Sequence, residues 1–193
     1  MSGKRLDDRP EVEVRSTEDL RIWLSDNHHR DSGVWLVTYK KSAGRHYVPI
    51  NDVIDELLCF GWVDSQSRGK DADRTMHWIA PRNPKSNWSG PNKKKIAALE
   101  AAGRMTPAGR ALVKAAKTNG CWTALDAVER LEVPEDLAIA FDSYPDAAAN
   151  WQGFNRSTKR ATLEWIVTAK RPDTRARRIA LAAQSAADNL PPR

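Results

Sequence analysis

The stretch Cys59–Asn92 has the sequence CFGWVDSQSRGKDADRTMHWIAPRNPKSNWSGPN, and the predicted fold of the whole chain is organised around it. It holds three of the chain's eight tryptophans, Trp62, Trp78 and Trp88, interleaved with charged and amide side chains. Core segments are seldom so rich in hydrogen-bonding groups, because burying such groups costs free energy unless they are paired. The stretch therefore combines features of a folding core with features of a binding surface.

A β-hairpin is predicted within this stretch. From Trp62 the residues alternate with a period of two, as in a strand, and the alternation places on one face the side chains of Trp62, Asp64, Gln66 and Arg68. Residues 69–73 are typical of a loop, and residues 74–80 supply the return strand. Pro81–Lys85 follows as a rigid connector, because each proline restricts both itself and the residue before it.

The flanking segments complete an α+β fold. Upstream, helices are predicted over 17–27 and 51–60, on either side of a strand over 33–40, with Ser16 and Asn51 as N-caps. Downstream, cap residues, prolines and helical periodicity predict helices alone, at about 89–103, 106–117, 123–130, 135–141, 146–153, 158–170 and 174–188. We therefore expect a small antiparallel β-sheet with helices in the N-terminal half and a mostly α-helical C-terminal half.

The expected domain organisation is an arm and one domain. Residues 1–15 are polar and lack a sustained period, so they predict a flexible N-terminal arm. Residues 16–193 are expected to form a single compact α+β domain, with the sheet in the part up to about residue 90 and helices over 90–190.

Composition excludes several classes of protein. The 193 residues are 40% hydrophobic and 29% charged, as in ordinary globular proteins. The apolar runs fall far short of the roughly 20 residues that a membrane span needs, and charged residues follow Lys4 and Arg5 where a signal peptide needs an apolar core. We expect a cytoplasmic protein in which Cys59 and Cys121 stay thiols. The net charge of +6 favours anionic ligands and partners.

Several long motifs occur in order along the chain. They are FGWVDSQ at 60–66, PR at 81–82, PKSNWS at 84–89, GRMTPAG at 103–109 and, further on, Ser157, Lys159-Arg160, Trp165-Ile166, Ala169-Lys170, Thr174-Arg175 and Arg178-Ile179. Together these motifs resemble those of the bacterial YdeI/OmpD-associated family, also called bacteriocin-protection proteins. The resemblance spans about Trp23 to Ile179 and implies a protective role without an established chemistry.

A binding site is predicted on the polar face of the hairpin, to which the proline connector can return basic side chains. With tryptophans as an apolar wall, the arrangement resembles a pocket for a small anionic ligand. The predicted ligand-binding residues are Trp62, Asp64, Gln66, Arg68, Arg82, Lys85 and Trp88. In the alternative interpretation the face is solvated, and Asp64 forms an ion pair with Arg68, Arg74 or Arg82.

Familiar catalytic and metal-binding motifs do not occur in the sequence. The four histidines lack the helical spacing of a metal pair, and there is no GxSxG, P-loop or GxGxxG motif. We therefore expect neither a metal nor a cofactor. His77 and Asp64 can meet across the hairpin as an acid–base pair, so an enzyme that uses Asp64 is an alternative function.

A second basic feature lies near the C-terminus, where Arg171, Arg175 and Arg178 fall on one side of the last predicted helix. This basic patch can bind nucleic-acid phosphates without sequence preference, or it is the solvated face opposite an alanine-rich stripe. The favoured function is non-enzymatic: a cytoplasmic stress- or bacteriocin-protection protein that binds a small anionic ligand or a protein partner.

Overall fold

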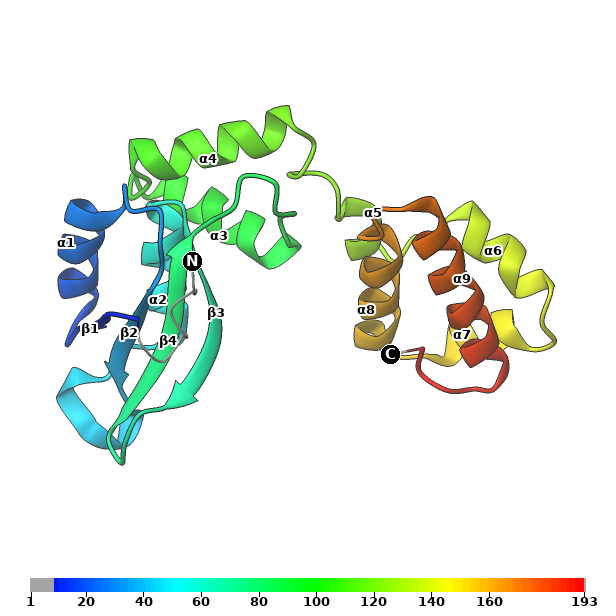
Figure 1. Ribbon diagram of the computed structural model, residues 1–193, viewed down its shortest axis with the longest axis horizontal. Helices are drawn as coiled ribbons and strands as arrows, with labels where there is room; N and C mark the ends of the chain where they lie inside the picture. Colours follow the sequence, from blue (N-terminus) through cyan, green and yellow to red (C-terminus); the bar gives the residue numbers. More distant parts are fainter. Residues whose placement is uncertain (1–8, 193) are drawn as a thin grey trace, which may run out of the picture. The chain divides into compact units, whose positions relative to one another are not determined.

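The computed structural model describes residues 9–192 and confirms the α+β fold class. The chain divides into two compact units, residues 1–122 and residues 123–193 (Figure 1). The first unit contains the sheet, and the second consists of helices. Each unit has its own hydrophobic core, and the prediction that both pack into one compact domain over 16–193 stays a prediction.

The sheet of the first unit has four strands in the order β1-β2-β4-β3. β2 (Val34–Tyr39), β4 (Arg74–Pro81) and β3 (Trp62–Gly69) form where the sequence predicts strands and pair antiparallel. β1 (Glu11–Glu13) pairs parallel to β2, so the sheet is mixed and not purely antiparallel. This part of the expected arm is therefore a strand. The sequence did not predict it, because β1 forms by pairing with β2 and not from a local pattern. Residues 1–8 of the arm lie outside the described residues.

The helical elements of the first unit are α1 (Thr17–Asn27), the 3-10 segment η2 (Lys41–His46), α2 (Ile50–Cys59), α3 (Gly90–Ala101) and α4 (Pro107–Thr118). α1 begins as predicted, with the Ser16 hydroxyl accepting the backbone N–H of Asp19 at 3.0 Å. α2 does not begin at the predicted cap Asn51, because the Pro49 carbonyl already accepts the first helical N–H groups. Gly61 ends α2 with a φ of 74°, a left-handed conformation that favours glycine.

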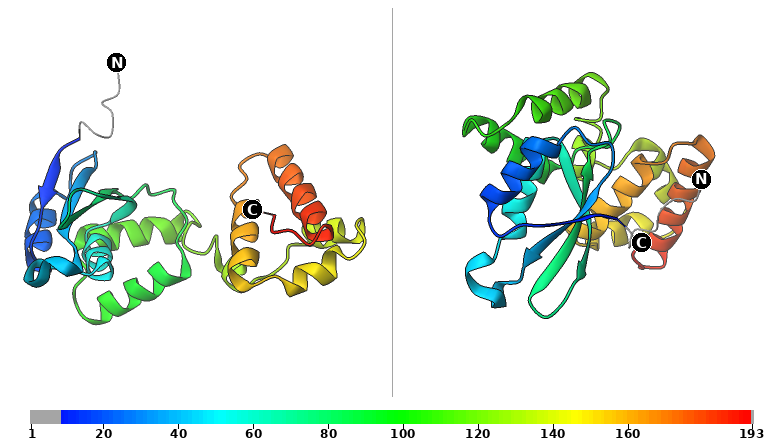
Figure 2. Two further views of the ribbon diagram at one scale, coloured as in Figure 1. Left: turned by 90° about the horizontal axis from the view of Figure 1, so that it is seen from below. Right: turned by 60° about the vertical axis from the view of Figure 1, so that its left-hand side comes forward.

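The main core of the first unit lies between one face of the sheet and the helices, and α1 and α2 run along that face (Figure 2). Strand residues such as Leu36 and Ile79 are fully buried there. α4 approaches the end of α2 at Gly109, where an added Cβ would lie 2.3 Å from the Cys59 carbonyl oxygen. The two helices can therefore cross at this distance only because Gly109 has no side chain.

The opposite face of the sheet carries a small aromatic cluster. Trp35, Val37 and Met76 are buried together, and the half-buried Trp78 meets the Trp35 ring edge to face at 5.4 Å. Both faces of the sheet thus bury apolar side chains, although the larger core lies on the helical side.

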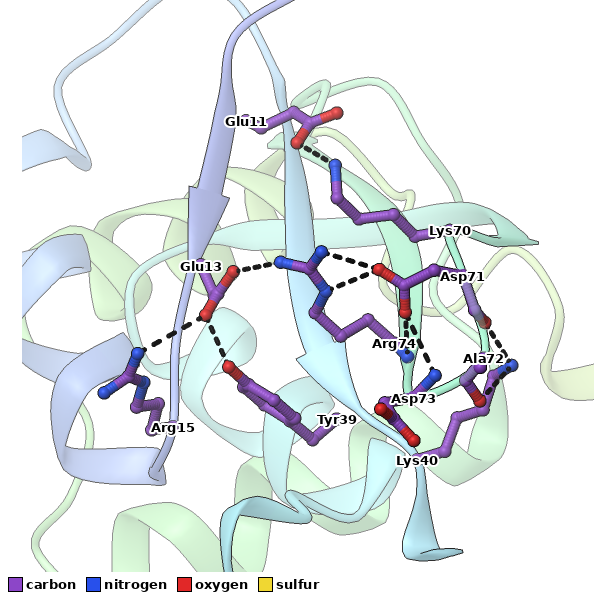
Figure 3. Close-up of polar contacts among 10 residues, drawn as sticks. All are labelled: Glu11, Glu13, Arg15, Tyr39, Lys40, Lys70, Asp71, Ala72, Asp73 and Arg74. Atoms are coloured by element: carbon purple, nitrogen blue, oxygen red, sulfur yellow. Dashed lines mark hydrogen bonds and ion pairs between the residues drawn. The ribbon is translucent and has the colours of Figure 1, made fainter. Parts of the chain in front are cut away.

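A belt of charges beside this cluster ties β1 to the β3–β4 hairpin (Figure 3). Arg74 lies between Glu13 and Asp71, with nitrogen–oxygen distances of 2.7 and 2.6 Å. The Tyr39 hydroxyl donates to Glu13 at 2.6 Å. The hydrogen bond from Tyr39 and the charge and hydrogen bond of Arg74 lower the pKa of Glu13. Side chains therefore reinforce a strand that has only a short ladder to β2.

The second unit consists of α5 (Asp126–Glu129), α6 (Glu135–Asp142), α7 (Ala147–Gly153), α8 (Arg156–Val167) and α9 (Pro172–Ala187). Each lies where the sequence predicts a helix, with ends that differ by a few residues. α9 packs against α6, α7 and α8. Trp151, Leu163 and Ile179 are buried in the core that these helices share.

Candidate functional site

A β-bulge in β3 rearranges the predicted binding face. Asp64 lies opposite Ile79 and Ser67 lies opposite His77, so three steps along β3 match two steps along β4. Such a bulge reverses the alternation of side chains beyond it. Ser67 consequently shares a face with Asp64, whereas Arg68 lies on the other face of the sheet.

The prediction that Trp62, Asp64, Gln66 and Arg68 share one face is therefore wrong. The guanidinium of Arg68 lies 4.2 Å from the centre of the Trp35 ring, on the side of the aromatic cluster. Gln66 is exposed within the bulge. A bulge in an edge strand cannot be recognised from the alternation of residues in the sequence. The assumed period of two therefore placed Arg68 on the wrong face of the sheet.

Both tryptophans of the predicted site belong to the core. Trp62 and Trp88 are 1% and 2% exposed, so neither presents a ring to a ligand. Trp62 donates its indole N–H to the His28 carbonyl at 3.1 Å. Arg82 is buried as well, with its guanidinium 4.0 Å from the Trp88 ring centre and Nη2 donating to the Asn87 carbonyl at 2.6 Å.

Arg82 has an unusual environment for a buried cation. Within residues 9–192 no carboxylate pairs with it, and its Nε has no hydrogen-bond partner. Burial accordingly lowers its pKa. Stacking on Trp88 offsets part of this cost, since a desolvated cation–π contact contributes about 2 kcal/mol. Lys85 lies exposed on the connector.

The structure thus distributes the seven predicted ligand-binding residues over the core, both faces of the sheet and the connector. They do not line one cavity together. Their role in binding stays a prediction.

A ligand-binding role of Asp64 stays a prediction, but the ion pair of the alternative interpretation, with Arg68, Arg74 or Arg82, is not present. The Asp64 carboxylate makes no hydrogen bond or ion pair with any residue that the structure describes, and Arg74 is engaged by Asp71 and Glu13 instead. Its charge does act on His77, whose pKa is lowered by burial and raised in part by Asp64. The Ser67 hydroxyl is the group in hydrogen-bond contact with His77, at 2.8 Å from Nδ1.

The C-terminal basic patch is largely engaged within its own unit. Arg175 pairs with Asp136 at 2.7 Å. Arg178 donates to the Trp165 carbonyl and lies 5.1 Å from that ring's centre. Arg171, directly before α9, is exposed. Two of the three arginines are thus engaged, Arg175 by a carboxylate and Arg178 by Trp165. Nucleic-acid binding by this patch stays a prediction.

A groove of about 690 Å³ lies between α3 and α4. Its floor is apolar, with the buried side chains of Ile96, Met105 and Val113. The short turn 102–106 joins the two helices, so they run antiparallel along the groove (Figure 2). The start of α3 therefore lies beside the end of α4.

One end of the groove is cationic and aromatic. Trp122 lines this end, and the Nζ atoms of Lys93 and Lys117 lie 5.6 and 5.2 Å from its ring centre. Lys93 also donates to the Trp122 carbonyl at 3.2 Å. Lys114 lines the groove about one helical turn before Lys117 and is exposed. Positive charge and an aromatic ring are therefore adjacent at this end.

The other end of the groove is electrically neutral. Arg110 lies 2.9 Å from Glu100 in an ion pair that spans α3 and α4. The groove is thus polarised along its length, from a cationic aromatic end to a paired, neutral end.

A buried carboxylate holds the turn beneath the neutral end. Glu56 of α2 is 3% exposed and accepts hydrogen bonds from Arg21 of α1 at 2.8 Å and from Arg104 at 2.6 Å. Arg21 also donates to the Arg104 carbonyl at 3.0 Å. Because Arg104 directly precedes Met105, these bonds fix the position of the groove floor relative to α1 and α2.

Sequence reasoning missed the groove although it predicted both of its helices. The lysines at 93–95 and the pair Lys114 and Lys117 are visible as basic runs. Which face of α3 meets which face of α4 is a tertiary property, however, and no local pattern carries it.

Two further findings concern the residues that the structure describes. Within residues 9–192, no three His, Cys, Asp or Glu side chains gather as they would around a metal ion. Over the same range, no helix has both the length and the hydropathy needed to cross a bilayer.

The fold and the groove define a two-unit α+β protein with a ligand-sized, cation-rimmed groove on a helical hairpin. Residues 12–112 match the family described as Domain of unknown function (DUF8412), and because this match covers more than half of the chain, the chain belongs to that family. Residues 130–189 match the family described as Bacteriocin-protection, YdeI or OmpD-Associated (OmdA).

The second match confirms the resemblance drawn from the C-terminal motifs, and its residues lie in the second unit. The resemblance was expected to begin near Trp23, but the motifs at 60–89 fall within the first match instead. No curated protein and no solved structure matches the chain.

Proposed function

We propose that this protein binds a small amphipathic anion in the α3–α4 groove and that its protective role depends on this ligand. The observation that carries the proposal is the polarised lining, an apolar floor between a cationic end and a neutral end. The volume of about 690 Å³ falls within the roughly 300–1,000 Å³ typical of small-molecule sites.

The lining defines the chemistry of the ligand. Its anionic group lies near Lys114 and Lys117, and a planar or apolar part packs beside Trp122 and over Ile96. Exposed lysines contribute only about 0–1 kcal/mol each to an ion pair. Apolar burial, at about 25 cal/mol per Å², therefore supplies most of the affinity, and the lysines supply orientation and the preference for an anion.

The protective part of the proposal is supported by the match of the second unit to the bacteriocin-protection family. A cytoplasmic location also belongs to the proposal. It is supported by the two cysteines, Cys59 and Cys121, which are free thiols, as expected in a reducing compartment.

The test is a fluorescence titration with 8-anilinonaphthalene-1-sulfonate, an aromatic anion of suitable size. We expect saturable binding of about one probe per chain. Ala97 lines the groove, so Ala97→Phe should fill it and abolish binding, whereas Ala98→Phe, at the exposed neighbouring position outside the lining, should bind as the wild type does. Equal binding by the wild type and Ala97→Phe would overturn the proposal.

A further inference from the structure

The bulge in β3 creates a hydroxyl–imidazole pair that a regular strand would not have. In unbroken alternation, Gln66 and not Ser67 would share the face of Asp64. The extra residue places Ser67 opposite His77 instead, with Oγ 2.8 Å from Nδ1. Bulges are concentrated next to functional sites, where they redirect a side chain.

We propose that Ser67 is a nucleophile with His77 as its general base, and that the pair reacts with small, activated acyl or phosphonyl esters. This activity is independent of the ligand proposed for the groove, because neither residue lines that groove. Two observations on the pair and its surroundings support it: the accessibility and protonation of its members, and the charge of Asp64.

Ser67 and His77 have the complementary exposures that such a pair requires. Ser67 is exposed, so an ester can reach its hydroxyl, whereas His77 is 9% exposed. Burial lowers the pKa of His77 below the ordinary value of 6.5. The imidazole is consequently neutral at pH 7, and Nδ1 can accept the Ser67 proton, with the remaining proton on Nε2.

Asp64 acts as a positioning residue by its charge. It lies on the same face as His77 and Ser67, and among the described groups it is the charged residue whose field acts on His77. When His77 takes up a proton, the negative charge of Asp64 stabilises the imidazolium that forms. No hydrogen bond joins the two residues, so this support is purely electrostatic.

The reaction step balances without a further reactant. The Ser67 oxygen forms a bond to the carbonyl carbon or phosphorus as the Ser67 proton passes to His77 Nδ1. The bond to the leaving group breaks with its electron pair, and the imidazolium then returns the proton to that group. With a fluorophosphonate, the products are a phosphonylated serine and hydrogen fluoride.

The experiment is labelling with a rhodamine-tagged fluorophosphonate, followed by intact mass and peptide mapping. We expect one adduct per chain, located at Ser67. The Ser67→Ala variant should not be labelled, whereas Ser65→Ala, its exposed neighbour in the bulge, should be labelled at the wild-type rate. The circular dichroism spectra of both variants report whether the fold is intact.

The dependence on pH distinguishes a general base from a passive neighbour. The wild-type labelling rate should rise with pH to a plateau, with a midpoint below pH 6.5, because burial lowers the pKa of His77 from that ordinary value. Asp64→Asn removes the charge that raises this pKa, so the midpoint of the profile should move to lower pH. Labelling of the wild type no faster than Ser67→Ala, or a profile with no midpoint near or below pH 6.5, would overturn the proposal.

Discussion

The carboxylate of Glu56 lies 2.6 Å from the guanidinium of Arg104, on the turn that leads to the groove floor. Because Arg21 holds the other carboxylate oxygen at 2.8 Å, one buried acid joins α1, α2 and the α3–α4 turn. The groove therefore depends on a residue that does not line it.

Glu56→Gln should lower the free energy of unfolding by about 3 kcal/mol, measured by urea denaturation. Removing one member of a buried ion pair costs about 3–5 kcal/mol, and the two arginines, 39% and 41% exposed, recover part of that by hydration. Glu100→Gln is the control. Its pair with Arg110 is about half exposed on both sides, so its loss should cost less than about 1 kcal/mol. Equal effects of the two substitutions would contradict the buried role of Glu56.

Gly109→Ala should destabilise the first unit by about 1–3 kcal/mol, because the new methyl group overpacks the α2–α4 crossing. The added Cβ would lie 2.3 Å from the Cys59 carbonyl oxygen, and backbone atoms cannot move away as a flexible side chain can. At Gly153 a Cβ meets nothing within 4 Å, so Gly153→Ala should leave the melting temperature almost unchanged. A Gly109→Ala variant with unchanged stability would show that α2 and α4 are not held at this distance.

Acid should release β1 before the rest of the sheet. Tyr39 and Arg74 lower the pKa of Glu13 from 4.5, and Arg74 lowers that of Asp71 from 3.8. As pH falls, the two carboxylates take up protons in the unfolded chain before they do so in the folded chain. The stability that their contacts contribute is therefore fully present above about pH 4.5 and is lost as pH falls through their lowered pKa values in the folded protein.

The measurement is hydrogen exchange of the β1 amides, expressed as protection factors between pH 7 and pH 3. Protection should fall at the acidic end in the wild type. In Arg74→Gln it should already be low at pH 7, since Glu13 and Asp71 lose their shared partner. Protection that stays constant down to pH 3 would mean that the ladder to β2 alone holds β1.

The two cysteines should differ sharply in reactivity. Cys59 is fully buried, and its burial, followed by the charge of Glu56, raises the pKa of its thiol. Cys121 is partly exposed. Iodoacetamide should therefore alkylate Cys121 in the folded protein and Cys59 only in urea. The Cys121→Ser variant should take up no label while it is folded. Labelling of this variant without urea would contradict the prediction, because it would show that Cys59 becomes accessible in the folded protein.

The sequence predicted elements well wherever a local pattern sufficed. Ser16 caps α1 as expected, and β3 and β4 have the predicted positions, because caps and alternation are properties of neighbouring residues. β1 and the bulge were not predictable in this way. β1 exists through its pairing with β2, and the bulge is visible only in the register between β3 and β4.

The candidate site was less predictable than the fold for the same reason. The functional prediction rested on polar side chains from Asp64 to Lys85, with tryptophans as the apolar wall of their site. The rings of Trp62 and Trp88 fill the core instead. The groove uses Lys114 and Lys117, ordinary exposed residues of a correctly predicted helix. They acquire a special environment only when α4 lies beside α3 and Trp122.

The central claim, that the groove selects an anion, is tested most directly by comparing two double variants of equal net charge. Lys114→Gln with Lys117→Gln removes charge from the groove, whereas Lys41→Gln with Lys94→Gln removes it from exposed positions outside the lining. Both are titrated with 8-anilinonaphthalene-1-sulfonate and with N-phenyl-1-naphthylamine, its uncharged counterpart. We expect the groove variant to bind the sulfonate about tenfold more weakly, a loss of about 1.4 kcal/mol, while the surface variant matches the wild type and the uncharged probe binds all three proteins alike. Equal sulfonate affinities in the two variants would contradict the claim, because the attraction would then come from the net charge of the whole chain.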